Sequence, residues 1–397
     1  MPHQRLRHLQ SLITKTMRFS PITGILGHRQ VGKTTLASLL SDCYVTLDLG
    51  TELSDASAEP MGFLAKHKAK PLIIDECQLA PALFPALKEW VRLHKEPGQF
   101  LLTGSVRFSS RKAIRESLTG RIINWELLPM DWAEQNSQPL ADKLLRLMKA
   151  KDLNIELKCN PTFTLKTYSR YLYTGGLPGV FGVRDAGIRT QRMETQINTI
   201  LERDLKLLVQ TSLDFKTLRR LLAALASQAG RRFSISEVAR VTRISLPTLR
   251  KLISALESMF VIRFIPSEGD FLKPVLFFED LAECAHLYPG VSDPQKSFLL
   301  FLYQNLRTQF HYRPEARAVA FSYAERSGHE IPLCFRCEQR LLGIIPVIDE
   351  STLSTAHKDA RNFIKRYPAA RVLLVGLGNN DLLMSRNIRY LGVNQML

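Results

Sequence analysis

The chain has 397 residues, more than one ordinary domain holds and enough to form several hydrophobic cores. Hydrophobic residues make up 45% of it and charged residues 23%, which excludes a disordered chain, and no apolar run reaches the roughly 18 residues of a membrane-spanning helix. Lys and Arg total 54 against 37 Asp and Glu, so the formal charge of +17 favours a polyanionic partner, nucleic acid before membrane. A generally basic proteome is the alternative explanation.

The six cysteines are scattered rather than set in a disulfide framework, which suits a reducing, cytoplasmic environment. Cys334 and Cys337 have zinc-knuckle spacing, but no second pair of ligands stands at a compatible spacing. The first 20 residues carry several bases and no acid, which faintly resembles an organellar presequence. Because they run directly into the first strand, we expect an N-terminal helix packed on the first domain instead.

Residues 22–135 alternate short apolar strands with helical patterns, which predicts an α/β fold with a mostly parallel sheet and helices on both faces. In chain order the expected elements are Ile22–Leu26, Thr34–Leu40, Tyr44–Leu47, Leu72–Asp75, Ala82–Leu93, Phe100–Thr103 and Ile122–Leu127.

A complete P-loop pattern follows the first of these strands and opens the first helix. Its glycines let the backbone wrap a phosphate, and successive N–H groups supply positive potential. Lys33 is expected to reach the β- and γ-phosphates of ATP, and the Thr34 hydroxyl is expected to ligate Mg²⁺. The predicted cofactor-binding residues are Gly27, His28, Arg29, Gln30, Val31, Gly32, Lys33, Thr34 and Thr35.

Two further strands end in polar residues that complete such a site. The apolar run from Leu72 ends in Asp75 and Glu76, so Asp75 would hold Mg²⁺ through water and Glu76 would polarise the attacking water. Strands often end in solvated carboxylates, but the P-loop upstream favours the catalytic interpretation. The strand from Phe100 ends in Ser105, which we expect to sense the γ-phosphate; the alternative is an ordinary strand-end turn.

Residues 136–215 change to long amphipathic segments, Lys143–Lys151 and Gln191–Val209, with a Gly-Gly-Leu-Pro break between them at 175–178. This pattern predicts a helical lid or linker region.

Residues 216–268 contain the pattern of a winged helix. Ser234–Val241 is a first short helix, Thr242 and Arg243 form a turn, and Ser245 caps a second helix that runs through Met259. Residues 200–263 hold 12 Lys or Arg and 5 Asp or Glu, a surplus of 12 − 5 = +7. In such folds the second helix enters the major groove of DNA, although many winged helices only pair proteins. The candidate nucleic-acid-binding residues are Arg243, Arg250 and Lys251.

Several runs together resemble the prokaryotic AAA-like ATPases: GHRQVGKTTL, LIIDECQ, LLTGS, ESLTGR, LLPMDWAE and YLYTGGLPGVF. The resemblance implies that the second acid of the IDE motif, Glu76, is catalytic. It also implies that the Arg of the LTGR motif, Arg121, acts as a trans finger or sensor arginine. A surface arginine at the start of the next strand is the alternative, and Arg107, Arg111 and Arg115 compete for the finger role.

The architecture that this resemblance implies has four parts. They are an AAA-like ATPase domain (1–135), a helical lid or linker (136–215), a winged helix (216–268) and a restriction-endonuclease-like domain (269–397).

The last domain departs from its nuclease-bearing relatives. Glu330-Ile331-Pro332 stands where they carry an acidic EVD run, and Pro346-Val347-Ile348 stands where they carry an E-x-K strand. A metal-dependent nuclease needs those carboxylates and that lysine. We therefore expect a binding or assembly module without nuclease activity.

The leading hypothesis is a cytoplasmic Mg-dependent ATPase coupled to DNA binding or remodelling, working as a homo-oligomer such as a ring, and without a membrane partner. One alternative is a slow ATP- or ADP-gated switch that acts on a protein partner. Another is a nucleic-acid scaffold with an idle ATP site, against which the intact Asp75 and Glu76 argue. Stimulation of turnover by DNA favours the first hypothesis, and tightly retained ADP with negligible turnover favours the switch.

Overall fold

The computed structural model describes residues 5–48, 50–67, 70–108, 118–289 and 293–397. Contacts between residues divide the chain into two compact units. The first comprises Met1–Pro129, Leu177–Gly182 and Ser254–Val261, and the second comprises Met130–Gly176, Val183–Ile253 and Ile262–Leu397. The expected helical, winged-helix and C-terminal domains fall mostly in the second unit, and this finer division stays a prediction.

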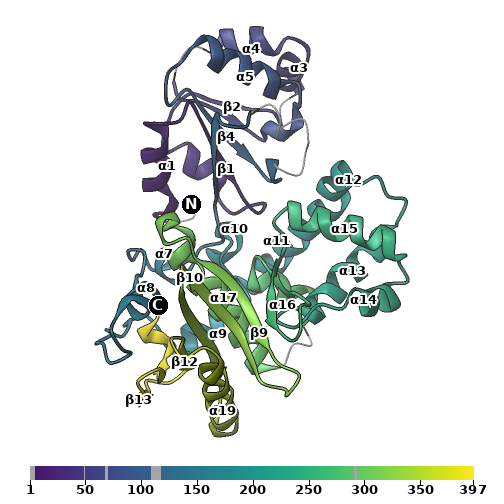
Figure 1. The fold of residues 1–397 in the computed structure, drawn as a ribbon. Coiled ribbons are helices and arrows are strands. Elements are labelled where there is room, and N and C mark those ends of the chain that lie inside the picture. Colours follow the sequence, from purple (N-terminus) through teal and green to yellow (C-terminus); the bar gives the residue numbers. More distant parts are fainter. Residues whose placement is uncertain (1–4, 49, 68–69, 109–117, 290–292) are drawn as a thin grey trace. The chain divides into compact units, whose positions relative to one another are not determined.

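The first unit is built on a five-stranded parallel sheet (Figure 1). Its strands are β1 (Ile22–Leu26), β2 (Tyr44–Thr46), β3 (Leu72–Asp75), β4 (Phe100–Gly104) and β5 (Ile122–Glu126). Their order is β2-β3-β4-β1-β5, and every neighbouring pair is parallel. The five expected strands are confirmed, with bounds that agree to within one residue. Because parallel strands carry their carboxyl ends at one edge, the loops after β1, β3 and β4 meet there.

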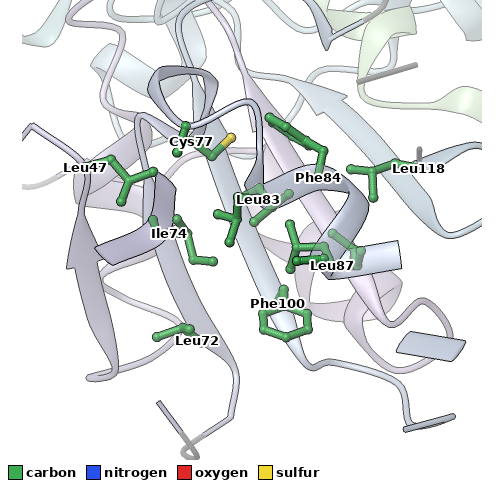
Figure 2. Packing of buried hydrophobic residues seen from close by; sticks show 14 of the residues in the cluster. Leu47, Leu72, Ile74, Cys77, Leu83, Phe84, Leu87, Phe100 and Leu118 are labelled. Atoms are coloured by element: carbon green, nitrogen blue, oxygen red, sulfur yellow. The ribbon is translucent and has the colours of Figure 1, made fainter. Parts of the chain in front are cut away.

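Helices surround this sheet and hold its strands in register. They are α1 (Leu9–Met17), α2 (Lys33–Ala37), α3 (Gly50–Ala58), α4 (Pro60–Lys66), α5 (Leu83–Leu93) and the short α10 (Pro178–Phe181). Leu83 and Leu87 of α5 lie with Ile74 of β3 and Phe100 of β4 in one buried cluster (Figure 2). Burying each such side chain contributes about 1.5–3 kcal/mol. The cluster therefore fixes β3 beside β4, and with them the polar residues that follow both strands.

The second unit begins with helices. They are α7 (Trp132–Gln135), α8 (Lys143–Lys149), α9 (Leu165–Thr174), α11 (Ala186–Thr199), a π-helical turn (Ile200–Asp204) and α12 (Leu205–Leu208). Gly175 ends α9 with a φ of 58°, and a Cβ there would lie 2.3 Å from Oδ1 of Asp280. The Gly176 N–H donates to Oδ2 of the same carboxylate at 2.7 Å. The two glycines therefore leave room for the Asp280 carboxylate, which accepts a hydrogen bond from the second of them.

Three helices and a two-stranded ribbon follow. The elements are α13 (Phe215–Gln228), α14 (Ile235–Thr242), α15 (Leu246–Ser258) and the antiparallel strands β6 (Ile262–Ile265) and β8 (Val275–Phe278). The Ser234 side chain caps α14, and Arg243 ends that helix in the left-handed conformation with a φ of 59°. On α15, Leu249 and Leu252 are buried while Arg250 and Lys251 are exposed, as the apolar periodicity predicts.

A mixed seven-stranded sheet forms the rest of the second unit (Figure 1). Its strands are β7 (Ser267–Gly269), β9 (Val319–Ala324), β10 (Glu330–Cys337), β11 (Arg340–Val347), β12 (Arg371–Gly376), β13 (Asp381–Ser385) and β14 (Ile388–Gly392). Their order is β13-β14-β12-β11-β10-β9-β7. The accompanying helices are α16 (Leu281–Leu287), α17 (Pro294–Leu306), α18 (Thr308–His311) and α19 (Glu350–Arg366).

The zinc-knuckle spacing of Cys334 and Cys337 falls within β10. Residues three apart on a strand point to opposite faces of the sheet, so the two thiols cannot ligate one ion together. In the described part of the chain, no group of three or more His, Cys, Asp or Glu side chains is placed to hold a metal ion.

None of the helices in the described ranges has both the length and the apolar character that crossing a membrane requires.

Candidate nucleotide site

The P-loop connects β1 to α2 and takes backbone conformations that most side chains avoid. Gly27 has a φ of 154° and Gly32 a φ of 98°. A Cβ on Gly27 would lie 2.4 Å from the carbonyl oxygen of Leu127, closer than any side chain can approach. Both glycines of the predicted pattern are therefore required by the turn itself.

Lys33 lies buried at the start of α2, and its ammonium closes the loop. Its Nζ donates to the carbonyl oxygens of Gly27 at 3.0 Å and His28 at 2.9 Å. An ammonium group carries three N–H donors, so it can bind the loop and a phosphate oxygen together.

The other predicted cofactor residues share this loop but differ in exposure. Gly27, His28 and Val31 are buried, Arg29 and Gly32 are half-buried, and Gln30, Thr34 and Thr35 are exposed.

Thr34 and Asp75 meet although 41 positions separate them in the sequence. The Thr34 hydroxyl donates to Oδ2 of Asp75 at 2.7 Å, which joins the P-loop to the end of β3. The Thr103 hydroxyl, on β4, donates to Oδ1 of the same carboxylate. Hydroxyl and carboxylate oxygens are the hard ligands that Mg²⁺ prefers, and Mg²⁺ needs only one or two of them from the protein. The two predicted metal ligands therefore fit the ion by chemistry and by proximity.

Tyr44 at the start of β2 is a third partner of Asp75, which the sequence interpretation missed. Its hydroxyl donates to Oδ2 at 2.7 Å. Burial and the hydrogen bond to this carboxylate raise the pKa of Tyr44 to about 12. The phenol therefore remains a donor at neutral pH.

Glu76 directly follows β3 and has a left-handed backbone, with a φ of 54°. Its N–H donates to Oγ1 of Thr103 at 3.3 Å. The Ser105 hydroxyl donates to its Oε2 at 3.3 Å, so the predicted sensor and the predicted base are in direct contact. Gln78 donates to the same oxygen. Like Tyr44 and Thr103, Gln78 was not among the predicted site residues.

Arg7 is a further residue that the pattern did not indicate. It precedes α1 and is buried, and its guanidinium donates to the carbonyl oxygens of Val31 at 2.6 Å and Leu128 at 2.5 Å. The only sequence signal was its place in the basic N-terminal segment. Arg7 ties the P-loop to the segment after β5.

The segment Leu177–Gly182, which belongs to the first unit, also reaches the P-loop. A Cβ on Gly32 would lie 3.5 Å from Cγ of Pro178, and one on Gly179 would lie 3.1 Å from Oε1 of Gln30. α10 therefore packs beside the loop.

Arg121 does not join this site within one chain. It precedes β5, whose first residue pairs with Ile22, the first residue of β1, whereas the P-loop follows the last residue of β1. Five strand residues at about 3.3 Å each separate the two edges of the sheet by about 16 Å.

Among the competing arginines, Arg107 is engaged in packing of the first unit. Its backbone N–H donates to the Ser258 carbonyl oxygen at 2.8 Å, and its guanidinium lies 4.4 Å from the ring centroid of Phe260. Its Nη1 lies 3.4 Å from Oε2 of Glu126. Arg111 and Arg115 lie outside the described residues.

The candidate nucleic-acid residues Arg243, Arg250 and Lys251 are all exposed and belong to the second unit. Arg243 ends α14, and Arg250 and Lys251 lie side by side in sequence on α15.

Comparisons with known proteins agree with the geometry of the first unit. Residues 20–136 match the family of the AAA domain, and residues 165–270 match a domain of unknown function, DUF8612. Two uncharacterized proteins, Mb2031c of Mycobacterium bovis and Rv2008c of Mycobacterium tuberculosis, are each 31% identical over 265 residues, which is 65% of this chain. The chain spans about half, 52%, of the length of these curated relatives.

Among solved structures, the Walker-type ATPase PABY2304 of Pyrococcus abyssi is 18% identical, with a TM-score of 0.42. The likeness covers 70% of this chain and 94% of that one.

The AAA domain match covers Lys33, Asp75, Glu76 and Ser105 together. With the P-loop and the parallel sheet, it marks this part of the chain as similar to an AAA domain.

Proposed function

We propose that this protein is a Mg-dependent ATPase whose nucleotide cycle is coupled to binding of DNA. The observation that carries the first half of this proposal is the 2.7 Å hydrogen bond between Thr34 and Asp75. It brings a phosphate-binding loop and an acidic strand end to the same point, with Glu76 and Ser105 beside them.

Each residue has a distinct task in hydrolysis. Lys33 binds the β- and γ-phosphates, while Thr34 and Asp75 hold the ion. Mg²⁺ supplies charge neutralisation on the phosphate oxygens when it is bound. Glu76 polarises the water that attacks the γ-phosphorus, and the bond from that phosphorus to the bridging oxygen breaks. Ser105, which contacts Glu76, is placed to sense the γ-phosphate.

The second half rests on charge and on the α14–α15 arrangement. Two helices joined by a tight turn, followed by a two-stranded antiparallel ribbon, are what a winged helix requires. Arg243, Arg250 and Lys251 are exposed there, in a stretch with a surplus of 12 − 5 = +7 charges. Phosphates of DNA are the complementary surface.

The seven-stranded sheet serves this protein as a binding or assembly module in our proposal. Pro332 and Pro346 lie in β10 and β11 and offer no metal ligand, and Glu330 lies 3.2 Å from Nη2 of Arg232. Purified protein should accordingly not cleave DNA with Mg²⁺ or Mn²⁺. Cleavage that survives Lys33→Ala and is lost on changing C-terminal carboxylates would contradict this.

A homo-oligomer such as a ring would let Arg121 act in trans. Within one chain Arg121 lies at the sheet edge away from the P-loop, so only a neighbouring subunit could bring it to the phosphates. If Arg121 is a true finger, Arg121→Ala should lower turnover by about 10³–10⁵-fold. Nucleotide binding should not weaken. Light scattering that finds a monomer in ATP at all concentrations would contradict the trans role.

The direct test is steady-state ATP hydrolysis with and without DNA, in the parental protein and in Glu76→Gln. We expect Mg-dependent turnover that DNA stimulates, and a Glu76→Gln variant that binds ATP and does not hydrolyse it. Equal turnover in both proteins would remove Glu76 from its role. Negligible turnover with tightly retained ADP would favour the nucleotide-gated switch instead.

A further inference from the structure

Gln78 lies between the two residues to which we assign water activation and phosphate sensing. It belongs to a short 3₁₀ turn (Cys77–Leu79) and is only 6% exposed. Its Nε2 donates one hydrogen bond to Oε2 of Glu76 and another, at 3.2 Å, to Oγ of Ser105. The Ser105 hydroxyl in turn donates to the same Oε2 at 3.3 Å. The three side chains form a closed triangle of hydrogen bonds.

The backbone beneath this triangle is held in a conformation that glutamate does not prefer. A non-glycine residue in the left-handed region is strained and persists where its surroundings fix it. Thr103 accepts the Glu76 N–H at 3.3 Å, and the Leu79 N–H donates to the Glu76 carbonyl oxygen at 3.0 Å. These contacts aim the Glu76 side chain toward Gln78 and Ser105.

Gly104 leaves the space that the Gln78 amide occupies. A Cβ on Gly104 would lie 2.8 Å from Oε1 of Gln78, and the φ of Gly104 is not in the left-handed region. The backbone there would thus accept alanine. The missing side chain is explained by the amide, and by the Phe108 ring whose Cε1 would lie 3.2 Å from the same Cβ, rather than by the turn.

We propose that Gln78 is a positioning residue. It holds the Glu76 carboxylate by a hydrogen bond to Oε2 and leaves Oε1 to accept a hydrogen bond from the attacking water. The proposal rests on the proposed function, in which Glu76 polarises that water. Among the described residues, Oε2 receives two donors and Oε1 receives none. A neutral amide suits this task because it donates without adding charge or titrating.

Gln78→Ala should lower kcat by about 10–100-fold, as loss of a supporting partner commonly does, with little change in KM or in Mg-ATP affinity. Gly104→Ala should displace the amide without removing it and should give a smaller loss of kcat. Both variants should retain nucleotide binding, so calorimetric titration with Mg-ATP shows whether each variant is folded and able to bind the nucleotide.

The chain offers a matched control in Gln99, a buried glutamine at the other edge of the same sheet. Its Nε2 donates to the carbonyl oxygens of His94 at 2.6 Å and Glu96 at 2.8 Å. Gln99→Ala should destabilise the fold and leave kcat close to the parental value.

A double-mutant cycle separates positioning from general loss of structure. Glu76→Gln should show no steady-state turnover, so the cycle compares the residual rates that single-turnover hydrolysis with excess protein resolves. If Gln78 acts through Glu76, then Gln78→Ala should not lower the residual rate of Glu76→Gln any further. Additive losses, or a Gln78→Ala variant with parental kcat while Glu76→Gln is inactive, would overturn the positioning role alone. If Gln78→Ala does not fold, parental kcat in folded Gly104→Ala would overturn it equally. Parental turnover in Glu76→Gln would instead refute the proposed function.

Discussion

At the scale of single residues, the hydroxyl of Thr103 serves both acidic residues of the candidate site. It donates to Asp75 and accepts the backbone N–H of Glu76, and its side chain is fully buried. Removing the hydroxyl would leave a buried carboxylate short of one donor and a half-buried N–H without its acceptor. Such groups are costly because no water replaces the lost partner.

We therefore expect Thr103→Val to lower the free energy of unfolding by about 1–3 kcal/mol and to lower kcat as well. Thr23 on the neighbouring strand β1 is the matched control, because its hydroxyl is buried and has no hydrogen-bond partner among the described residues. Thr23→Val should be neutral or stabilising. Denaturant unfolding of both variants decides the point, and equal losses would contradict the role given to Thr103.

The site residues found from the sequence are those that a linear pattern can specify. Lys33 and Thr34 follow from the P-loop, and Asp75 and Glu76 follow from the end of an apolar strand. Tyr44, Thr103 and Arg7 escaped, as did the contact of Gln78 with Ser105, because these roles depend on contacts across strands or between distant segments. Strand order and register create those contacts, and no spacing in the chain encodes them.

At the scale of elements, strong periodicity in the sequence was sufficient to predict the strands of the first sheet. All five strands of the first sheet are confirmed, since short apolar runs bounded by polar residues read clearly as buried parallel strands. Helices α3 and α4 were not predicted. Only Ala56 of α3 and Phe63 and Leu64 of α4 are fully buried, so their sequences carry little apolar periodicity. The expected helix Gln191–Val209 is found as α11, a π-helical turn and α12.

A buried ion cluster connects β6, β8 and α17 in the second unit. Glu279 follows β8 and is 1% exposed, and it accepts from Nε of Arg263 at 2.6 Å and Nη2 of Arg307 at 2.5 Å. Burial alone would raise the pKa of Glu279, but the charges and hydrogen bonds of the two arginines outweigh it and hold the pKa well below its usual range.

Glu279→Gln should destabilise the fold by about 3–5 kcal/mol, because two arginines would remain without their buried counter-charge. The folded pKa is lower than the unfolded one, so this stability is present above about pH 4.3 and is lost as the pH falls below it. The free energy of unfolding of the parental protein and of Glu279→Gln is measured at neutral and at acidic pH. The difference between the two proteins should become smaller as the pH falls.

The half-buried pair Glu268 and Arg336 provides the control for this prediction. Their side chains are 32% and 39% exposed, so Glu268→Gln should cost only about 0–1 kcal/mol. A Glu279→Gln loss no larger than that of Glu268→Gln would mean that the buried cluster does not stabilise the fold.

Helix α15 makes a second prediction at this scale. Replacing Arg250 and Lys251 with alanine removes two exposed charges and leaves the buried Leu249 and Leu252 in place. Each phosphate contact contributes about −0.9 to the slope of log K against log salt on duplex DNA, so the slope should become shallower by up to about 2. Fluorescence anisotropy over a salt series measures both slope and affinity.

The matched control changes two exposed bases of α19, Arg361 and Lys365, to alanine. It removes the same charge from another surface of the second unit. An equal change of slope in both double variants would show that net charge alone acts, and no change with α15 would place the DNA surface elsewhere.

At the scale of the whole molecule, the sequence and the structure specify the nucleotide site in more detail than the binding partner or the number of subunits. The AAA domain match and the parallel sheet agree over residues 20–136, where local pattern and tertiary contacts converge on one site. The partner and the subunit number depend on surfaces, and the formal charge of +17 indicates only the chemistry that such a partner would have. Surface residues are weakly constrained by the fold, so patterns specify them least.

The central claim is that this chain binds Mg-ATP through Lys33, and calorimetric titration of ATP in the presence of Mg²⁺ tests it most directly. Lys33→Ala removes the cation of the P-loop and should weaken binding on the order of 10²-fold or more, since hydrogen bonds to charged groups each contribute about 1.5–3 kcal/mol. Lys296 is the matched control: it is a buried lysine whose Nζ also donates to two carbonyl oxygens, those of Ala226 at 3.2 Å and Ser227 at 2.9 Å. The account predicts parental ATP affinity in Lys296→Ala and loss of binding in a folded Lys33→Ala. Unchanged ATP affinity in folded Lys33→Ala would contradict it.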